Sequence, residues 1–353
     1  MLRKLSLFIC LALASFYSFA QEDSTKKSNW SFTSFVDGYY RSDFNQNLSN
    51  NRTSFTNSNN KLALGMVSAK VDYAYKNLSF SADLGVGKRI KEFAYNDKGV
   101  LSYVKQLYAS YALSDWLKLT AGSWATHVGY ELVDPYANRN YSMSYMFSYG
   151  PFLHTGIKAD LTFGTTGFMI GVANPTDYRK APGGSKKFIL LQWSQAINEE
   201  IKFYLNYVGG ERPSDAAKTK QIDLVVTAKI NDEFGIGFNG TVNSIKQQFN
   251  NSLTDASSWS GAAVYFNYDP TEKLGLTLRT EMFNDKKQLA ALGSALAGTS
   301  ILANTLSANI KIGKFTIIPE LRHETAGKNI YIAKDGASKN SDLSMLVGAY
   351  FKL

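Results

Sequence analysis

The sequence predicts an all-β protein, a transmembrane antiparallel up-and-down β-barrel of about 16 strands with short periplasmic turns and long outer loops. Three observations support this prediction. An apolar leader opens the chain, apolar and polar residues alternate over most of the remainder, and very short turns alternate with longer polar segments. Alternation with a period of two is typical of strands, because successive side chains of a strand point to opposite faces of the sheet.

Residues 1–20 have the pattern of a secretory signal peptide. Arg3 and Lys4 are positive, and the run from Leu5 to Phe19 is apolar but too short for a membrane-spanning helix. Ser18-Phe19-Ala20 resembles a small-x-small cleavage site. We therefore expect export across the inner membrane and cleavage near Ala20.

The remainder is expected to hold a short polar segment at 21–28 and one single barrel at 29–353. The only cysteine, Cys10, lies inside the leader behind Ile9, where a lipoprotein signal needs a small residue. The mature chain is therefore expected to form neither disulfides nor thiolate metal sites. Aromatic residues make up 14% of the chain, yet its mean hydropathy is slightly negative. This combination is typical of a barrel with an apolar outer surface and a wet interior.

The first strands show the alternation most clearly. Between residues 63 and 75, one set of alternate positions is expected to form an apolar face, and the other set turns charged at Lys70 and Asp72. The expected apolar face holds Ala63, Gly65, Val67, Ala69, Val71, Tyr73 and Tyr75. The turn Lys76-Asn77 and a second alternating strand at 78–87 complete a hairpin.

The same hairpin recurs along the chain. The expected tight turns are Lys76-Asn77, Ser114-Asp115, Gly164-Thr165, Asn198-Glu199, Asn231-Asp232-Glu233, Asp269-Pro270-Thr271-Glu272 and Gly313-Lys314. The expected longer loops are 45–60, 91–99, 131–150, 174–186, 209–218, 247–258, 284–299 and 326–341. Hydrocarbon offers the backbone no hydrogen-bond partner, so such a sheet must close on itself, with tight turns at the periplasmic rim.

Aromatic residues cluster at the expected turns, as an interfacial girdle does. They are Tyr73, Tyr75, Trp116, Phe234, Tyr268 and Phe315. The chain ends on an amphipathic strand from Leu343 to Leu353, with Phe351 two places before the end. This strand resembles the terminal signal of outer-membrane barrels, so outer-membrane lipid and the assembly machinery are expected partners.

Two other folds stay open. Residues 289–306 are rich in Ala and Leu and could form a weak transmembrane helix, although several Ser, Thr and Asn residues interrupt them. We expect a short loop helix there that leads into a strand. Alternating strands also build soluble sandwiches and barrels, but long strands in unbroken up-and-down succession disfavour them.

The middle of the chain carries a specific resemblance. Its most distinctive blocks are Gly122 to Glu131 (GSWATHVGYE), Asn138 to Ser142 (NRNYS), Ser148 to Phe152 (SYGPF) and His154-Thr155-Gly156. With the turn Leu113 to Leu117 (LSDWL) and the end of the chain, they resemble the OmpL-like β-barrel porin family of Bacteroidetes. The resemblance covers essentially the whole mature chain. It implies an outer-membrane location and a pore, and it brings no established substrate or catalytic residue.

The segment 131–150 is the candidate constriction loop, the third outer loop by our count. Glu131, Asp134 and Arg139 supply charge, while Tyr141 and other aromatic residues supply bulk. A loop folded into the lumen would set the size limit and place opposed charges across the path. The alternative is a loop that packs over the barrel mouth.

Charged residues at alternating strand positions are expected to face water in the lumen, because a Lys or Arg in mid-bilayer lipid costs about 2 to 4 kcal/mol. They either create a field that selects solutes or form a cross-strand ladder of paired charges. The set comprises Lys70, Asp72, Asp83, Arg89, Lys158, Asp160, Lys202, Asp223, Lys229, Arg279, Glu281, Glu320 and Arg322.

Other functions have weak support. The formal charge of +9 suggests a modest preference for anions, whereas scattered basic residues disfavour nucleic acid as a partner. His127, His154 and His323 lack metal-ligand spacing, and neither an HExxH motif nor a nucleophile elbow is present. We therefore expect no enzyme, metal or cofactor, although a hydrolase built from His154 and Asp160 stays conceivable.

The sequence thus predicts an outer-membrane porin of a Gram-negative bacterium that allows passive diffusion of small hydrophilic solutes, including anions. The alternative is a surface receptor or adhesin that acts through its outer loops. A homo-oligomer stays open.

Overall fold

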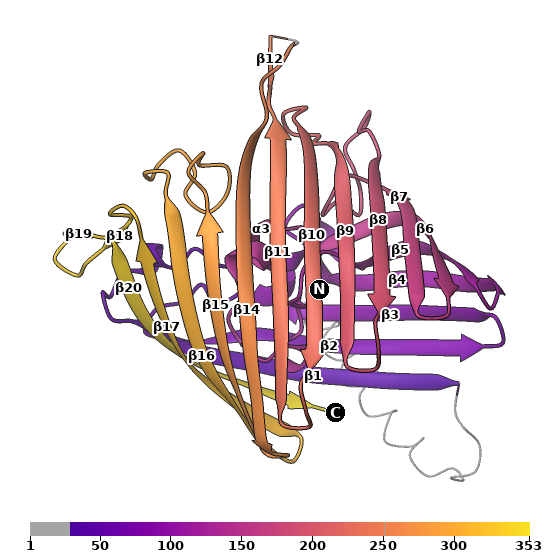
Figure 1. The fold of residues 1–353 in the computed structure, drawn as a ribbon, viewed down its shortest axis with the longest axis horizontal. Coiled ribbons are helices and arrows are strands. Elements are labelled where there is room, and N and C mark those ends of the chain that lie inside the picture. The colour runs from indigo at the N-terminus through magenta and orange to yellow at the C-terminus, as the bar shows by residue number, and fades with distance from the viewer. Residues whose placement is uncertain (1–28, 251) are drawn as a thin grey trace.

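The computed structural model describes residues 29–250 and 252–353, so the predicted signal peptide and the segment at 21–28 lie outside the described residues. The described residues form one closed antiparallel barrel of 16 strands (Figure 1). This confirms the predicted fold class and strand count. In order around the barrel the strands are β1 (Trp30–Asp43), β2 (Lys61–Tyr75), β3 (Leu78–Gly87), β4 (Val104–Ser114), β5 (Leu117–Ala125), β6 (Leu153–Phe163), β7 (Thr166–Ala173), β8 (Phe188–Ala196), β9 (Ile201–Glu211), β10 (Lys218–Lys229), β11 (Phe234–Lys246), β14 (Ser257–Thr271), β15 (Leu274–Asn284), β16 (Ser300–Ile312), β17 (Phe315–Ala326) and β20 (Ser341–Lys352).

The last strand closes the barrel. β20 pairs with β17 on one side and with β1 on the other, from Phe35 opposite Lys352 to Asp43 opposite Ser344. Every strand of the ring therefore has two neighbours, and no edge leaves a row of backbone N–H and C=O groups without partners. Closure of this kind is what a sheet surrounded by hydrocarbon requires.

Short and long connections lie at opposite rims (Figure 1). At the rim that we call the turn rim, tight turns fall at the predicted positions 76–77, 164–165 and 313–314, while the β4–β5 turn lies at 115–116, one residue later than predicted. Gly164 and Gly313 have φ of 60°, a conformation that glycine adopts without strain. The longer connections form the loop rim.

The loops carry short elements only. They are η2 (Leu48–Asn50), α2 (Lys88–Phe93), η3 (Gly99–Tyr103), η4 (Pro135–Ala137), α3 (Tyr145–Tyr149) and the two small hairpins β12 (Gln248–Phe249) with β13 (Ser252–Leu253) and β18 (Tyr331–Ile332) with β19 (Ser338–Lys339). Among the described residues, no helix has both the length and the apolar character to cross a membrane.

The prediction of a loop helix at the start of 289–306 is wrong, because the described residues between β15 and β16 form no helix. The predicted strand is present, since β16 occupies the end of that segment. Asp285 organises the loop instead, because its carboxylate accepts the N–H groups of Leu289, Ala290 and Leu292. These side-chain bonds replace the backbone bonds of a helix, and Gly293 continues with φ of 52°.

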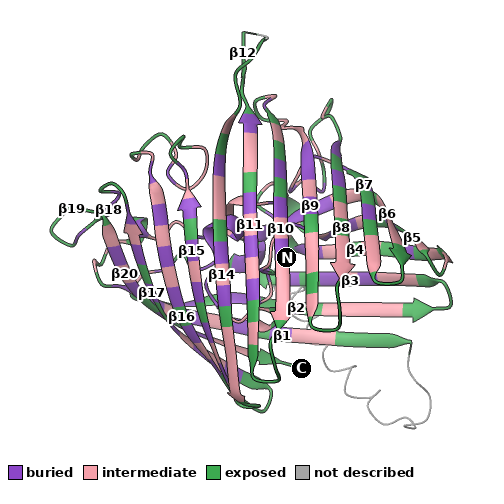
Figure 2. Cartoon of the chain, in the orientation of Figure 1, coloured by how far each residue is buried: buried purple, intermediate pink, exposed green. Residues whose placement is uncertain are grey.

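Buried and exposed residues alternate along the strands (Figure 2). On β10, Gln221, Asp223 and Val225 are buried inside the barrel, whereas Ile222 between them points outward and is 52% exposed. Apolar residues thus face outward and mostly polar residues face inward, the reverse of a soluble protein.

The predicted alternation is wrong at one point of β2. Ala63 and Gly65 were expected to share the apolar face of Val67, but they face inward, and Leu64 between them points outward with 78% exposure. From Val67 onward the predicted assignment holds, with Lys70 and Asp72 on the inner face. The two halves of the strand are therefore out of phase by one residue.

A β-bulge causes this change of phase. The register between β1 and β2 shifts between Val36 and Gly38, so that Gly65 and Met66 together stand opposite Asp37. The Asp37 carboxylate accepts the Met66 N–H at 2.7 Å and fills the space that a Cβ at Gly65 would need. A glycine therefore allows the inward carboxylate to approach the backbone.

Aromatic side chains form pairs near the turn rim. Trp30 packs on Tyr73 with ring centroids 4.5 Å apart, and Phe234 stacks on Tyr268 at 4.4 Å. Trp116 lies against Phe163 at 5.9 Å. Most of the residues that form these pairs are those that the sequence predicted for an interfacial girdle.

Substitutions on the two faces of β8 test whether the outer face of the barrel contacts lipid and the inner face contacts water. Leu191 points outward and is 40% exposed, whereas the next residue, Gln192, faces the lumen and bonds Asn206. We expect Leu191→Lys to lower the free energy of unfolding by about 2 to 4 kcal/mol and Gln192→Lys to lower it much less. Urea unfolding in lipid vesicles measures both. A greater loss for Gln192→Lys would contradict the assignment of the faces.

Candidate functional site

The connection between β5 and β6, residues 126–152, enters the barrel, and we call it the lumen loop. It contains η4, α3 and the predicted loop 131–150. Asn140 of this loop donates to Ser307 on the inner face of β16 at 2.6 Å, and the Asn309 side chain donates to the Arg139 carbonyl at 2.7 Å. The predicted loop therefore lies inside the ring of strands.

Two carboxylates of the barrel wall hold the backbone of the lumen loop. Glu281 on β15 accepts the N–H groups of Tyr145 and Met146, each at 2.9 Å, at the start of α3. Glu320 on β17 accepts the N–H groups of Tyr141 and Ser142. These N–H groups are buried, so each would be costly without a partner.

Two arginines of the same wall bind the carbonyl groups of the lumen loop. Arg279 on β15 pairs with Glu131 and donates to the carbonyl groups of Ser142 and Met143. Arg322 on β17 also donates to the Met143 carbonyl, at 2.8 Å, and pairs with Glu324 on its own strand. All these charges are buried and paired, as buried charges must be.

The loop is also tied to the neighbouring part of the wall, where β1 follows β20 in the ring. On β1, Asp37 accepts the Tyr141 hydroxyl and pairs with Arg89 at 3.2 Å, and Arg89 also donates to the Val133 carbonyl. Arg89 was predicted on a strand, but it lies in α2, in the connection between β3 and β4. Gly87, with φ of 137°, ends β3, and the chain turns inward there. Burial holds the pKa of the Tyr141 hydroxyl well above its usual range.

Lys105 at the start of β4 completes this side. Its ammonium lies 2.9 Å from Asp83 on β3 and 2.7 Å from Asp134 of the lumen loop. The predicted residues Asp83 and Asp134 are thus brought together by a lysine that the sequence did not single out.

Glycines of the wall make room for the loop. A Cβ at Gly348 on β20 would lie 2.3 Å from the Tyr141 ring, and one at Gly237 on β11 would lie 2.6 Å from the Tyr130 ring. Neither contact is possible for a larger residue unless the loop moves. The wall and the lumen loop are therefore fitted to each other.

The remaining predicted charges lie nearer the turn rim. Lys70 pairs with Asp72 and Lys158 with Asp160, each at 3.0 Å and each two residues apart on one strand. Lys229 pairs with Asp232 at 2.6 Å. These ion pairs lie within the wall and its turns and do not include residues of the lumen loop.

Arg139 connects the lumen loop to this region. Its guanidinium binds both carboxylate oxygens of Asp269 and donates to Thr277 on β15 at 2.8 Å. Lys202 lines a cavity nearby.

Residues 127–130 of the lumen loop, which we call the strap, cross to β9–β11. His127 Nε2 lies 3.1 Å from the Tyr207 carbonyl, and the Gly129 N–H donates to Asp223 on β10 at 2.9 Å. Tyr130 stacks on Tyr265 of β14 at 4.1 Å. Burial lowers the pKa of His127 to about 4, so its ring is neutral at pH 7 and donates through Nε2.

Amide side chains dominate the wall that the strap meets. Asn206 donates to Asp223 at 2.9 Å, and Asn239 donates to its second oxygen. Gln221 and Asn243 continue the series toward the loop rim, where Asn243 donates to Gln221 at 3.2 Å. This part of the inner wall offers uncharged hydrogen-bonding groups rather than ion pairs.

Two cavities lie along this wall, on either side of the strap. The mouth cavity, about 370 Å³, reaches Thr219 and Gln221 on β10 from the loop rim. The turn-rim cavity, about 360 Å³, reaches Thr227 and Lys229 on the same strand from the other end. Asp223, which holds the strap, lies between these pairs, so the strap separates the two cavities.

A family model described as "Putative beta-barrel porin-2, OmpL-like" matches residues 29–353. The chain belongs to this porin family. The match confirms the resemblance seen in the sequence, and family and fold together indicate an outer-membrane porin that is a channel rather than an enzyme. A comparison with curated proteins gives no match.

Solved structures of outer-membrane proteins share the fold of this porin. An anion-selective porin from Comamonas acidovorans has a TM-score of 0.61 at 10% identity, with 93% of this chain and 100% of that chain covered. OmpT of Vibrio cholerae has a TM-score of 0.58 at 10% identity, with 94% and 100% covered. At this identity the likeness concerns the fold alone.

The structure does not assemble the conceivable hydrolase site of the porin. His154 contacts Thr126 at 3.1 Å and lies over the His127 ring at 5.2 Å, while Asp160 bonds Lys158. No group of three or more potential metal-ligating side chains occurs among the described residues.

Several residues of the site were missed in the sequence. Asp37 on β1 and Lys105 on β4 hold the lumen loop, and Asp269 pairs with Arg139. For Asp37 a signal was present, because Asp37, Arg41 and Asp43 stand at alternating positions of one strand. Lys105 has no comparable signal, since it stands at the boundary of a loop and a strand.

The buried ion pair between Asp37 and Arg89 should dominate the stability of this side. We expect Asp37→Asn to lower the free energy of unfolding by about 3 to 5 kcal/mol, because Arg89 stays buried without a counter-charge. Asp72→Asn is the matched control, since its half-exposed pair with Lys70 is worth at most about 1 kcal/mol. Equal losses in urea unfolding would contradict this role of Asp37.

Proposed function

We propose that this porin lets small hydrophilic solutes diffuse passively across the outer membrane, between the lumen loop and the wall of β8–β11. One observation carries the proposal: the mouth cavity and the turn-rim cavity lie along one polar wall, and the strap contacts that wall between them. A solute that passes the strap finds hydrogen-bonding groups on both sides of it. The loop rim then faces the exterior and the turn rim the periplasm.

Hydrogen bonds, ring contacts and a buried apolar side chain hold the strap. Gly129 bonds Asp223, and His127 bonds the Tyr207 carbonyl. Tyr130 stacks on Tyr265, and Val128 is buried in an apolar cluster with residues of the wall. The opposite part of the lumen loop, in contrast, is held by buried arginines and glutamates. The strap itself contains no Lys, Arg, Asp or Glu, so its movement would break no ion pair, unlike displacement of the rest of the loop.

The loop 131–150 is proposed to act as the constriction. Its charged residues Glu131, Asp134 and Arg139 are all paired with the wall, so in this proposal they fix the position of the loop. The loop then limits the size of the solute by occupying the lumen, while the strap defines the narrowest point.

Several expectations from the sequence belong to the same proposal. They are the cleavage near Ala20, an origin in Bacteroidetes, recognition of β20 by the assembly machinery and assembly into homo-oligomers. The position of β20 supports the third of them, because this strand closes the barrel between β17 and β1.

A receptor or adhesin is the second candidate. Two observations favour it: the strap contacts the wall between the cavities, and the β12–β13 hairpin extends beyond the other loops (Figure 1). A closed lumen with an extended loop suits binding at the surface. Conductance distinguishes the two functions.

The strap contact gives a test by conductance. In planar bilayers we expect stepwise single-channel conductance, and a larger step for Asp223→Ala, because the Gly129 N–H then loses its acceptor and the strap is released. Asp160→Ala is the control, since that carboxylate binds Lys158 and not the strap. A lack of steps in every variant would exclude the pore and favour the receptor.

Deletion of residues 134–148 tests the constriction separately. The conductance should rise, because the deletion removes most of the material that fills the lumen. A gel-mobility assay of heated and unheated protein verifies that the barrel still folds. Unchanged conductance of a folded deletion variant would refute the constriction.

The charge of the lumen is tested by ion selectivity. The formal charge of +9 favours anions, but the charged residues of the lumen are largely paired, so we expect only a weak preference for chloride. The reversal potential in a potassium chloride gradient measures it. A reversal potential of the sign for cations would refute the preference.

A further inference from the structure

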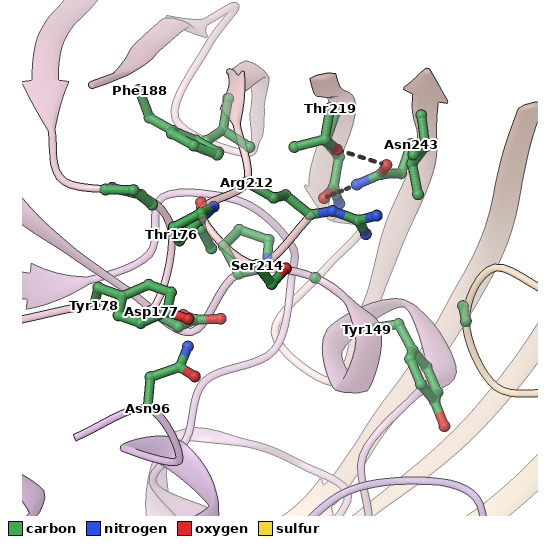
Figure 3. A pocket seen from close by; sticks show the side chains of 18 of the residues that line it. Asn96, Tyr149, Thr176, Asp177, Tyr178, Phe188, Arg212, Ser214, Thr219 and Asn243 are labelled. Atoms are coloured by element: carbon green, nitrogen blue, oxygen red, sulfur yellow. Dashed lines mark hydrogen bonds between the residues drawn. The ribbon is translucent and has the colours of Figure 1, made fainter. Parts of the chain in front are cut away.

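The mouth cavity has the composition of a binding site. It lies at the loop rim between the lumen loop, the loop 174–187 that connects β7 and β8, and the wall of β8–β11 (Figure 3). With about 370 Å³ it lies within the range of small-molecule pockets, about 300 to 1,000 Å³. Aromatic rings and uncharged polar groups make up much of its lining. The lining includes the aromatic residues Tyr95, Tyr149 and Tyr178 and the polar or charged residues Asn243, Asp177 and Arg212.

The two charged residues of the lining both have partners within the protein. Asp177 accepts the N–H groups of Phe152 and Leu153 and the Tyr95 hydroxyl, while burial raises its pKa to about 6. Arg212 binds both carboxylate oxygens of Asp215. Both charged side chains of the cavity are therefore already engaged in hydrogen bonds before a solute arrives.

Hydrogen bonds fix two of the aromatic rings. The Tyr149 hydroxyl donates to the Arg52 carbonyl at 2.9 Å, and the Tyr95 hydroxyl donates to Asp177 at 2.9 Å. Tyr178 is the third ring and is partly exposed. Because rings held in place lose little freedom when a ligand arrives, they suit stacking against an apolar molecular face.

A chain of polar side chains lies beside the rings. Thr219 donates to Asn243 at 3.0 Å, Asn243 donates to Gln221, and Gln221 donates to Thr241 (Figure 3 shows the first two bonds). An amide has two N–H groups and two acceptor sites, so Asn243 keeps capacity for a further partner. Such groups can both donate to and accept from hydroxyl groups.

We propose that the mouth cavity binds an uncharged, polyhydroxylated solute, such as a mono- or disaccharide, before it passes the strap. A sugar ring has an apolar C–H face for the tyrosines and hydroxyl groups for Asn243 and its neighbours. A charged solute would lose hydration without gaining a counter-ion. This inference rests on the proposed function, since it names the solute that the pore takes.

The test is binding of maltose to the detergent-solubilised porin, measured by isothermal titration calorimetry. We expect Tyr178→Leu and Asn243→Ala each to weaken binding about threefold to tenfold, the loss that one stacking contact or one hydrogen bond causes. Lactobionate, a disaccharide derivative with a carboxylate, should bind about tenfold or more weakly than maltose.

Tyr103→Leu is the matched control, because Tyr103 is 44% exposed at the loop rim and does not line the cavity. Wild-type affinity for maltose in both cavity variants, or equal affinity for lactobionate, would overturn the proposal. Conductance without maltose binding would overturn it and leave the pore intact. Maltose binding without conductance would support the site and contradict the pore.

Discussion

The demand that every buried backbone group find a partner shapes this protein at two levels. In the wall, the demand is met by closure of the sheet, where β20 pairs with both β17 and β1. In the lumen, it is met by side chains of the wall. Glu281 and Glu320 accept hydrogen bonds from N–H groups of the lumen loop, and Arg279 and Arg322 donate hydrogen bonds to its carbonyl groups. The loop thus resides inside the barrel because the wall replaces the water that its backbone would otherwise bind.

This arrangement divides the lumen into two unlike halves. The walls of β1–β4 and β14–β20 carry buried ion pairs, which serve to hold the loop. The wall of β8–β11 carries amides and accepts hydrogen bonds from the strap at Asp223 and at the Tyr207 carbonyl, with a cavity at either end. Charges that are paired and buried contribute little to a field in the remaining passage, so the formal charge of the chain is a poor guide to what the pore selects.

The bulge in β2 connects the barrel wall to the lumen loop. By turning Gly65 and Met66 toward Asp37, it places one carboxylate where it can meet the backbone, Arg89 and Tyr141 at once. A single inserted residue thereby connects the wall, the second loop and the lumen loop. Bulges are common at such functional positions because they redirect a side chain without breaking the sheet.

The sequence by itself determined the barrel, its strand number, its two kinds of connection and the identity of the third loop, because strand periodicity and turn residues are local signals. Only the tertiary structure decided which charges meet. Glu131 and Arg279 are 148 residues apart in sequence, and Arg89 reaches Asp37 from a helix rather than from a strand. The phase of Ala63 and Gly65 likewise depends on a neighbouring strand. Such ion-pair partners come together only when the barrel closes and brings distant segments into contact. A local sequence pattern does not contain this information.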